Sequence, residues 1–205
     1  MSDQTRIAVH GATGRLGRLI VAEAGEAYAG PVPRAGDLPD CDVVIDVSSA
    51  EGLAALIPRL RGQPLVVGTT GDLPLAALEA YAASAPVALV PNFSVGIPLL
   101  LDLVERAVGR LPPGWHIEVV ESHHAAKKDA PSGTAKRLVR AIGRADVPTH
   151  SLRVGDTVGE HTVWLAGPGE RIELKHVATR RAVFAIGALR WAREIRQLPP
   201  GLHRP

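Results

Sequence analysis

The sequence is poor in cysteine, in aromatic side chains and in long apolar runs. Cys41 is the single cysteine, which excludes an internal disulfide and a cysteine metal site, and we interpret it as a small packed residue. Aromatic residues make up 3% of the 205 residues, so few side chains can stack on nucleic-acid bases. No apolar run reaches the roughly 20 residues of a membrane span, and no charged and then apolar leader opens the chain. We therefore expect a cytoplasmic protein with no membrane partner.

An excess of one charge is also lacking. The 23 Lys and Arg residues nearly balance 21 Asp and Glu residues, which leaves a net charge of +2. A late basic cluster is better explained as a solvated helix face or a subunit contact than as a nucleic-acid site. It consists of Arg180, Arg181, Arg190, Arg193 and Arg196. The 46% hydrophobic content fits one globular domain or two small ones, and we expect no nucleic-acid partner.

A glycine loop follows the first strand expected, residues 6–10. It has the spacing G-x-x-G-x-x-G and leads into a helix pattern through Leu16, Leu19 and Ile20. Strand, glycine turn and helix are what a dinucleotide pyrophosphate needs, because glycines admit the phosphates and the helix start supplies N–H donors. Thr13 stands where the commoner fingerprint has its second glycine, so a bare turn is the alternative. The cofactor-binding candidates here are Gly11, Ala12, Thr13, Gly14, Arg15 and Leu16.

Residues 30–40 occupy the place of the second strand in an ordinary nucleotide fold. Three prolines in this segment argue against a central strand, so we expect a shortened nucleotide domain without it. Arg34 is a candidate for a cofactor 2′-phosphate, whereas Asp37 lies at the distance where an acidic residue would bind the ribose. The preference between NADH and NADPH stays open.

Apolar runs at residues 43–47, 65–67 and 87–90 alternate with helix patterns. This alternation predicts a Rossmann-like, doubly wound parallel sheet, with ligands beyond the carboxyl ends of its strands. Later segments change character: residues 117–120 form a further strand, and residues 171–177 alternate apolar and charged side chains. We expect a nucleotide domain of residues 1–94 plus 182–205, ending in a frayed tail from Pro199, and an α+β mixed-sheet domain of residues 95–181.

Residues 121–134 hold the densest ionisable chemistry in the chain. His123 and His124 leave a strand, Lys127 follows, and a Ser-Gly-Thr turn opens a helix whose start suits a carboxylate or phosphate. Histidine exchanges protons near neutral pH, and lysine donates one if its pKa is lowered. Glu121 and Asp129 could hold these cations in place. Adjacent histidines do not match the spacing of zinc hydrolases, and we expect no metal.

This stretch, E-x-H-H-x-x-K-x-D-A-P-S-G-T, resembles the signature of the 4-hydroxy-tetrahydrodipicolinate reductase (dihydrodipicolinate reductase) family of lysine and diaminopimelate biosynthesis. Residues 11–17, 68–71 and 92–96 also fall in that family's order, and the resemblance runs to about Arg190. It implies an oxidoreductase that uses NADH or NADPH to reduce a cyclic dicarboxylate, 4-hydroxy-tetrahydrodipicolinate, to tetrahydrodipicolinate with loss of water. It also implies a homotetramer formed through the sheet of the second domain.

The resemblance assigns a role to each matching residue. It makes His123 the acid/base histidine and Lys127 the proton donor, with substrate contacts from His124, Gly133 and Thr134. Two further loops would carry contacts on the nicotinamide side, namely Gly68, Thr69, Thr70, Val90, Pro91, Asn92 and Phe93.

Two other functions remain open. A dinucleotide-sensing module without turnover is suggested by the expected absence of a second strand and by the short tail. Another NAD(P)-linked reductase of a related carboxylate is compatible with the glycine loop alone. The His-His-Lys stretch favours the reductase, because it concerns the substrate rather than the cofactor.

Overall fold

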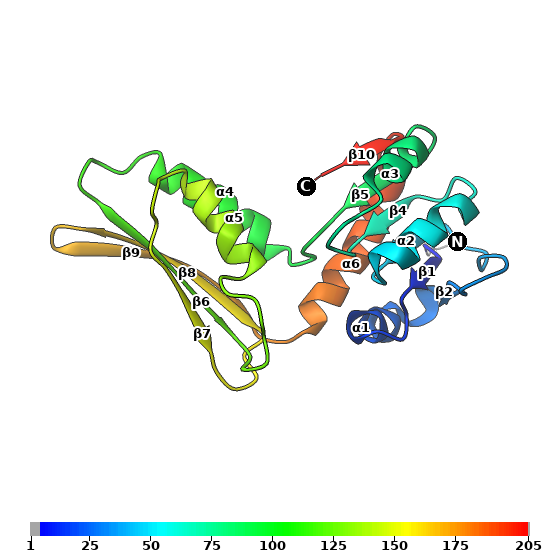
Figure 1. Cartoon of the computed structure of the whole chain (residues 1–205), viewed down its shortest axis with the longest axis horizontal. Coiled ribbons are helices and arrows are strands. Elements are labelled where there is room, and N and C mark those ends of the chain that lie inside the picture. The colour runs from blue at the N-terminus through cyan, green and yellow to red at the C-terminus, as the bar shows by residue number, and fades with distance from the viewer. Residues whose placement is uncertain (1–4, 205) are drawn as a thin grey trace. The chain divides into compact units, whose positions relative to one another are not determined.

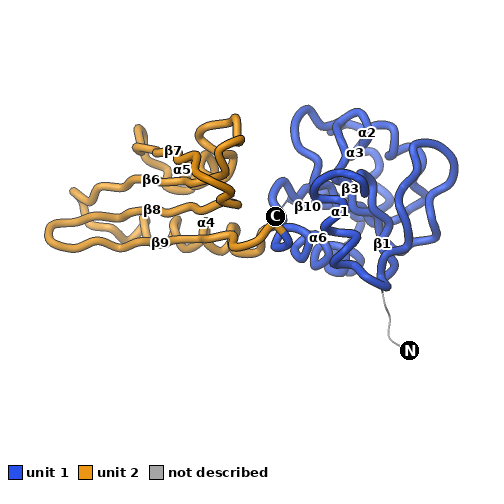
Figure 2. Tube along the Cα trace, turned by 90° about the horizontal axis from the view of Figure 1, so that it is seen from below, with its two compact units in different colours: residues 1–93, 182–205 blue, residues 94–181 orange. Residues whose placement is uncertain are grey.

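The computed structural model describes residues 5–204 of the chain. They divide into two compact units, one of residues 5–93 with 182–204 and one of residues 94–181 (Figure 2). We call them the first and the second unit. None of the helices in residues 5–204 has the length and apolar character needed to cross a membrane.

The first unit contains a six-stranded sheet in the order β10-β5-β4-β3-β1-β2, in which every pairing is parallel (Figure 1). Its strands are β1 (Ile7–His10), β2 (Tyr28–Pro31), β3 (Val43–Asp46), β4 (Leu65–Val67), β5 (Pro86–Leu89) and β10 (Gly201–His203). The strand order reverses between β1 and β3, where such sheets form their ligand crevice. The parallel Rossmann-like sheet expected from the alternation is therefore confirmed.

Helices cover both faces of this sheet. They are α1 (Arg15–Ala24), α2 (Ala50–Leu56), α3 (Leu75–Ala82) and α6 (Ala182–Glu194), with short 3-10 turns η1 (Gly25–Ala27), η2 (Ile57–Arg59) and η3 (Ile195–Gln197). The strands send alternate residues to two separate cores. Ile7 and Val9 pack with α1 and α6, whereas Ala8 packs with α2 and α3. Continuous apolar strands such as β3 are thus explained by burial on both faces.

Two expectations about this unit were wrong. The second strand is present as β2, and it pairs only with β1 at the edge of the sheet. An edge strand needs hydrogen bonds on one side alone, so Pro31 is tolerated at its end. The tail after Pro199 is not frayed, because Gly201–His203 pairs with β5 at the opposite edge.

The second unit is built on a four-stranded sheet in the order β7-β6-β8-β9. Its strands are β6 (His116–His123), β7 (Thr149–Arg153), β8 (Gly159–Gly167) and β9 (Glu170–Ala178). Strands β6 and β7 run parallel and the other pairs antiparallel, which confirms the mixed sheet. Helices α4 (Gly96–Val108) and α5 (Gly133–Ile142) pack on one face through a core that includes Val104, Val119, Leu138 and Val163.

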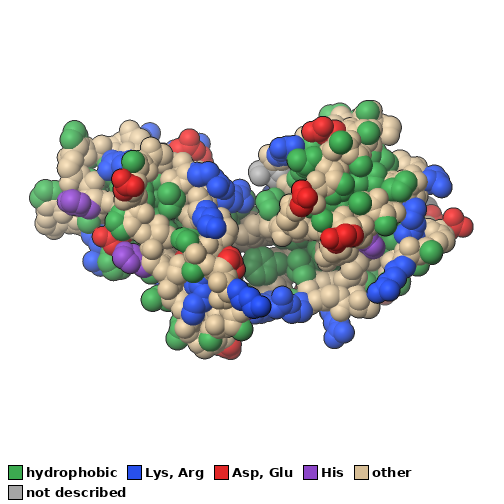
Figure 3. All heavy atoms as spheres, in the orientation of Figure 1, with side chains coloured by type: hydrophobic (Ala, Val, Ile, Leu, Met, Phe, Trp, Pro, Cys, Tyr) green, Lys and Arg blue, Asp and Glu red, His purple; other side chains and the backbone are tan. Residues whose placement is uncertain are grey.

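The opposite face of this sheet carries no helix from the described part of the second unit. The register places Leu152, Trp164 and Val177 on it, and all three side chains are exposed. Arg171 lies over the ring of Trp164, 4.7 Å from its centroid. Acidic and basic side chains are interspersed over the visible surface of each unit (Figure 3).

Candidate active site

Strand β6 directs Glu121 and His123 into the interior of the second unit. Side chains alternate along a strand, so both lie on the face of Val119, which α4 and α5 cover. Glu121 is fully buried, and the His123 side chain is 12% exposed. A buried carboxylate is costly unless it is paired, so its partners define the site.

Glu121 accepts hydrogen bonds from three directions. His123 donates from Nδ1, the backbone N–H of Ser132 donates over 3.2 Å, and Arg153 donates from Nη1 (3.1 Å) and Nη2 (2.8 Å). Burial alone would raise the pKa of Glu121, but hydrogen bonds from Arg153, Ser151 and His123 outweigh it and lower the pKa to about 2. The carboxylate is therefore ionised at every pH at which the protein would work.

An ionised Glu121 decides the tautomer of His123. A carboxylate can only accept, so Nδ1 of His123 carries the hydrogen and Nε2 is the ring nitrogen left to exchange a proton. Burial lowers the pKa of His123, Glu121 opposes this, and the cations of Lys127 and Arg153 lower the pKa further. His123 is thus held neutral near pH 7, in a form that can accept a proton at Nε2 and return it.

The loop after β6 places Lys127 beside this pair. His124 is the first residue after the strand, and its carbonyl accepts a hydrogen bond from the backbone of Lys127 over 3.0 Å. Lys127 Nζ binds both carboxylate oxygens of Asp129, at 2.7 and 2.9 Å, and its side chain is 21% exposed. The neighbouring Lys128 is exposed. The structure therefore brings together the histidine and the first lysine of the motif.

Helix α5 starts at the same end of the site. Ser132 is its N-cap, and the hydroxyl accepts a hydrogen bond from the backbone of Ala135 over 3.1 Å. Gly133 and Thr134 form the first turn, where N–H groups and the positive end of the helix dipole favour an anion. The Ser-Gly-Thr turn is the helix start that its sequence predicted.

Two residues of this site were missed by the sequence analysis. Arg153 comes from the end of β7, and His161 comes from β8, where it pairs in register with Glu121. His161 is 4% exposed, shares a 3.1 Å hydrogen bond with the hydroxyl of Ser132, and meets the ring of His123 edge-on with centroids 5.2 Å apart. Burial, followed by the charge of His123, lowers the pKa of His161 to about 4. Only strand pairing brings these residues to the motif, and no local pattern marks them.

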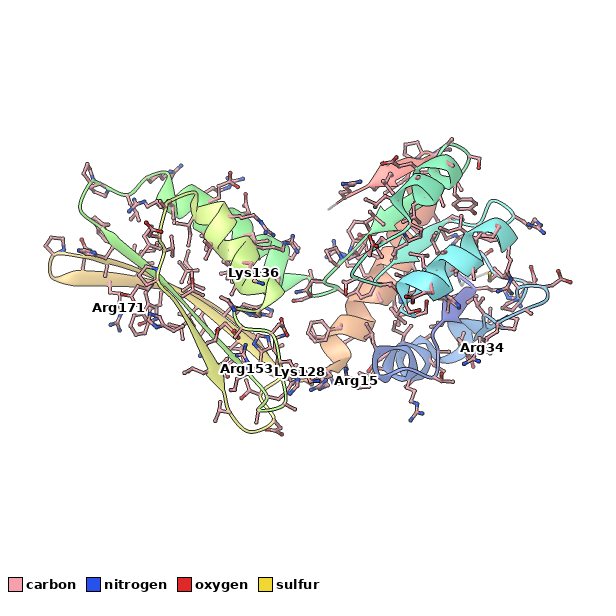
Figure 4. The ribbon with its side chains drawn as sticks, in the orientation of Figure 1. Arg15, Arg34, Lys128, Lys136, Arg153 and Arg171 are labelled. Carbon is pink, nitrogen blue, oxygen red and sulfur yellow. The ribbon has the colours of Figure 1, made fainter. Side chains whose placement is uncertain are left out.

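A cleft of about 770 Å³ opens in the first unit beside the switch point between β1 and β3. Its lining includes Gly11, Ala12 and Thr13 of the predicted loop, together with Arg34 and Arg59. Arg59 donates hydrogen bonds to the carbonyls of Pro33 and Gly36, each at 2.8 Å, and so fixes the loop that carries Arg34. Arg34 lies beyond β2, and Arg15 lies at the start of α1 (Figure 4).

Buried Asp46 connects the ends of three strands next to this cleft. It accepts hydrogen bonds from His10 (2.7 Å), Ser48 (2.6 Å) and Thr69 (2.5 Å). The side chain of Thr69 is therefore engaged in holding its own loop. The network explains the single acidic residue in the otherwise apolar strand β3.

The two later loops of the predicted cofactor site contact each other. A Cβ at Gly68 would lie 2.3 Å from the ring of Phe93, so only glycine fits there. The side chains of Val90 and Phe93 are buried in the core, which leaves their backbone as the part that can meet a ligand. Thr70 and Pro91 are exposed, and Asn92 is half-buried.

Comparison with known proteins shows the family of the chain. The family described as dihydrodipicolinate reductase, C-terminus, matches residues 96–204. A curated 4-hydroxy-tetrahydrodipicolinate reductase of Stenotrophomonas maltophilia (strain R551-3) is 44% identical over 228 aligned positions, which cover 97% of this chain and 95% of that protein. The chain belongs to the 4-hydroxy-tetrahydrodipicolinate reductase family. The reductase of Myxococcus xanthus (strain DK1622) is 42% identical and covers 98% of this chain and 88% of its own.

A solved reductase of this family shares the fold. Dipicolinate-bound dihydrodipicolinate reductase from Paenisporosarcina sp. TG-14 matches with a TM-score of 0.77 and 19% identity, over 98% of this chain and 97% of that one. The Stenotrophomonas alignment is longer than the 205 residues here, so that reductase has segments that this chain lacks. The second strand of the first unit is nevertheless retained, as β2 beside β1.

The family uses a nicotinamide dinucleotide, and the glycine loop fits such a group. A Cβ at Gly11 would lie 2.7 Å from the carbonyl oxygen of Val47, and one at Gly17 would lie 2.1 Å from that of Gly11. Only glycine allows this close packing of the turn, and Gly11, Ala12 and Thr13 line the cleft, where phosphates could approach backbone N–H groups. Among residues 5–204 no group of three or more His, Cys, Asp or Glu side chains is arranged to hold a metal ion.

Proposed function

We propose that this chain reduces 4-hydroxy-tetrahydrodipicolinate to tetrahydrodipicolinate with loss of water, using NADH or NADPH, in diaminopimelate and lysine biosynthesis. The observation that carries the proposal is the set Glu121, His123 and Lys127 beside the start of α5. It combines a neutral histidine, a cation and an anion-binding helix start. Family membership at 44% identity supports the same reaction.

In the proposed reaction His123 exchanges a proton at Nε2 and Lys127 donates the proton that matches the hydride. The bound cofactor supplies that hydride. Glu121 holds His123 in one tautomer, and Asp129 holds the Lys127 ammonium in place. General acid–base steps of this kind contribute about 10²- to 10⁴-fold to a rate.

The proposed substrate is a cyclic dicarboxylate, held through its anionic groups. Gly133 and Thr134 would bind one carboxylate at the start of α5, and His124 would add a contact from the loop. The solved reductase from Paenisporosarcina carries dipicolinate, a compound of the same class. This supports a small dicarboxylate as the substrate.

The two units would divide the work. Residues 1–94 plus 182–205 would bind the dinucleotide through Gly11–Leu16, Arg34 and the loops at Gly68–Thr70 and Val90–Phe93. Residues 95–181 would bind the substrate and form the subunit contacts of a homotetramer. The exposed face with Leu152, Trp164 and Val177 supports that last role, since apolar side chains gathered on a sheet face mark an interaction surface. We place the enzyme in the cytoplasm, with no nucleic acid as a partner.

The sensor alternative has lost its main support. It was motivated by a missing second strand, and β2 is present. His123 and Lys127, which lie in the same site, also have a clear use in proton transfer and none in sensing.

The experiment that tests the reaction follows NADH or NADPH absorbance after mixing the protein with the condensation product of pyruvate and aspartate semialdehyde. Oxidation that requires this product would establish the reaction, and the ratio of the two rates would give the cofactor preference. Lys127→Ala should lower kcat by about 100-fold or more, whereas the matched control Lys128→Ala should not. Cofactor binding without oxidation would reject the reductase, and a Lys127→Ala kcat within a few-fold of the parent would reject the proton-donor role.

A further inference from the structure

Arg153 is the last residue of β7 and lies level with His123 of the neighbouring strand β6. Both point to the helix-covered face of the sheet, and the Arg153 side chain is 18% exposed. Arg153 and Lys128 lie at the same end of the second unit, whereas Arg171 lies well away from them (Figure 4). A guanidinium group with so little exposure needs hydrogen-bond acceptors within the protein, and the acceptors of Arg153 indicate its role.

The guanidinium group of Arg153 binds two different parts of the site. Nη1 and Nη2 bind the two carboxylate oxygens of Glu121, at 3.1 and 2.8 Å. Nη2 also donates to the backbone carbonyl of Asp129 over 2.6 Å. One planar group therefore joins the carboxylate that orients His123 to the residue whose side chain holds Lys127, a geometry that a lysine cannot reproduce.

The contact with Glu121 bears on the charge of His123. A buried carboxylate with only a histidine beside it would retain a proton on that ring, as an imidazolium–carboxylate pair. Arg153 already neutralises Glu121, so the ring of His123 need not be positive. Lys127 in the loop acts in the same direction as Arg153, because its charge also lowers the pKa of His123. His161 from β8 meets the ring of His123 edge-on.

The contact with the Asp129 carbonyl bears on Lys127. The loop from His124 to Pro131 leaves β6 and returns to α5, and its exposed residues have little packing of their own. A charge-assisted hydrogen bond to its backbone fixes the point from which the Asp129 carboxylate reaches Lys127.

We propose that Arg153 is a positioning residue for the reaction. It supplies the counter-charge that lets His123 stay neutral beside buried Glu121, and it fixes the loop that presents Lys127. The inference rests on the proposed function for its effect on turnover, whereas its effect on the charge of His123 can be measured without turnover.

The test compares Arg153→Gln and Arg153→Lys with the parent, and uses Arg144→Gln as a matched control. Arg144 is an exposed arginine of the same unit that also donates to a backbone carbonyl, that of Trp115. Nitrogen-15 NMR of histidine-labelled protein gives the protonation midpoint of His123, whose signal is assigned by its loss in His123→Gln. Steady-state kinetics give kcat, KM and their pH profiles.

In Arg153→Gln we expect the His123 midpoint to move to higher pH and kcat to fall at least tenfold, with the cofactor KM within about twofold of the parent. Arg153→Lys keeps the positive charge but loses the planar guanidinium group that binds Glu121 and Asp129 together. We therefore expect kcat to fall while the protonation midpoint of His123 moves little. Arg144→Gln should match the parent in both.

If Arg153→Gln keeps the parent's midpoint and kcat, the proposal is wrong. If Arg153→Gln does not fold, a parental kcat in Arg153→Lys overturns it. If the parent protein shows no turnover but the protonation midpoint of His123 still changes in Arg153→Gln, the proposed function is refuted. The role of Arg153 in positioning His123 would stand.

Discussion

Acidification should destabilise the second unit through His161. This side chain is 4% exposed, and its Nδ1 has no partner among the described residues. Burial opposes a positive charge on His161 most, and the charges of His123, His176 and Lys127 add to this, whereas Glu121 favours the charge. The pKa of His161 is about 4 in the folded protein, whereas the ordinary value of a histidine, which applies to the unfolded chain, is 6.5. Between these values the unfolded chain binds a proton that the folded protein does not. The stability is therefore complete above about pH 6.5 and is lost as the pH falls toward 4.

The size of the effect follows from the two pKa values. Near pH 7.5 His161 is neutral in both states and contributes almost nothing. Near pH 5 the unfolded histidine is mostly protonated and the folded one is not, which costs about 2 kcal/mol of unfolding free energy. Glu121 does not add to this loss, because its pKa is about 2 and the carboxylate stays ionised at pH 5.

Urea unfolding at about pH 7.5 and about pH 5 measures this loss. Since the units can unfold separately, both proteins should carry Trp191→Phe, so that tryptophan fluorescence reports only the second unit, which contains Trp115 and Trp164. The matched variant is His161→Gln, whose amide keeps a polar group near Ser132 but does not titrate. Burial also lowers the pKa of His123 and His176, so both proteins lose some stability. The parent should lose about 2 kcal/mol more than His161→Gln. Equal losses in the two proteins would refute the reasoning.

Two further outcomes follow from packing. Gly187→Ala would place a Cβ 1.8 Å from the carbonyl oxygen of Phe93, so we expect it to lower the unfolding free energy of the first unit by more than about 2 kcal/mol in urea. Arg190→Ala on the same helix should cost little, and a Gly187→Ala midpoint equal to that of the parent would contradict the packing. Trp164→Lys places a charge on the sheet face that carries no helix, and it should reduce the mass of the assembly measured by light scattering. The control Leu99→Lys, at an exposed position of α4, should leave that mass unchanged. An unchanged mass in Trp164→Lys would exclude that face as the subunit contact.

Much of the fold could be predicted from the sequence because its signals are local. The apolar runs predicted β3, β4 and β5, and the Ser-Gly-Thr turn predicted the start of α5. The missed strands β2 and β10 are both at sheet edges, where proline and glycine are tolerated because one side of the strand needs no partner. Their pairing is decided by the strand beside them and not by their own residues.

The site shows the same limit. The histidines, the lysine and the helix start lie within one short stretch, and their types alone suggested the chemistry. Arg153 and His161 join the site because β7 and β8 pair with β6. No sequence pattern within β7 or β8 predicts that pairing. The available clue was that Glu121 directly follows the strand expected at residues 117–120. A carboxylate that such a strand buries, as the structure shows for Glu121, needs a cationic partner from elsewhere.

The return of the chain to the first unit has a consequence for biosynthesis. Ala185, Ala188 and Ile195 are fully buried in the core that also contains Ile7 and Val9, and β10 closes one edge of the sheet. On the ribosome, residues 1–93 are made long before these partners exist, whereas residues 94–181 emerge as an uninterrupted segment with their own core. The part of the protein synthesised first is therefore completed last, and a nascent chain stalled before Ala182 would expose an unfinished apolar sheet to chaperones and proteases.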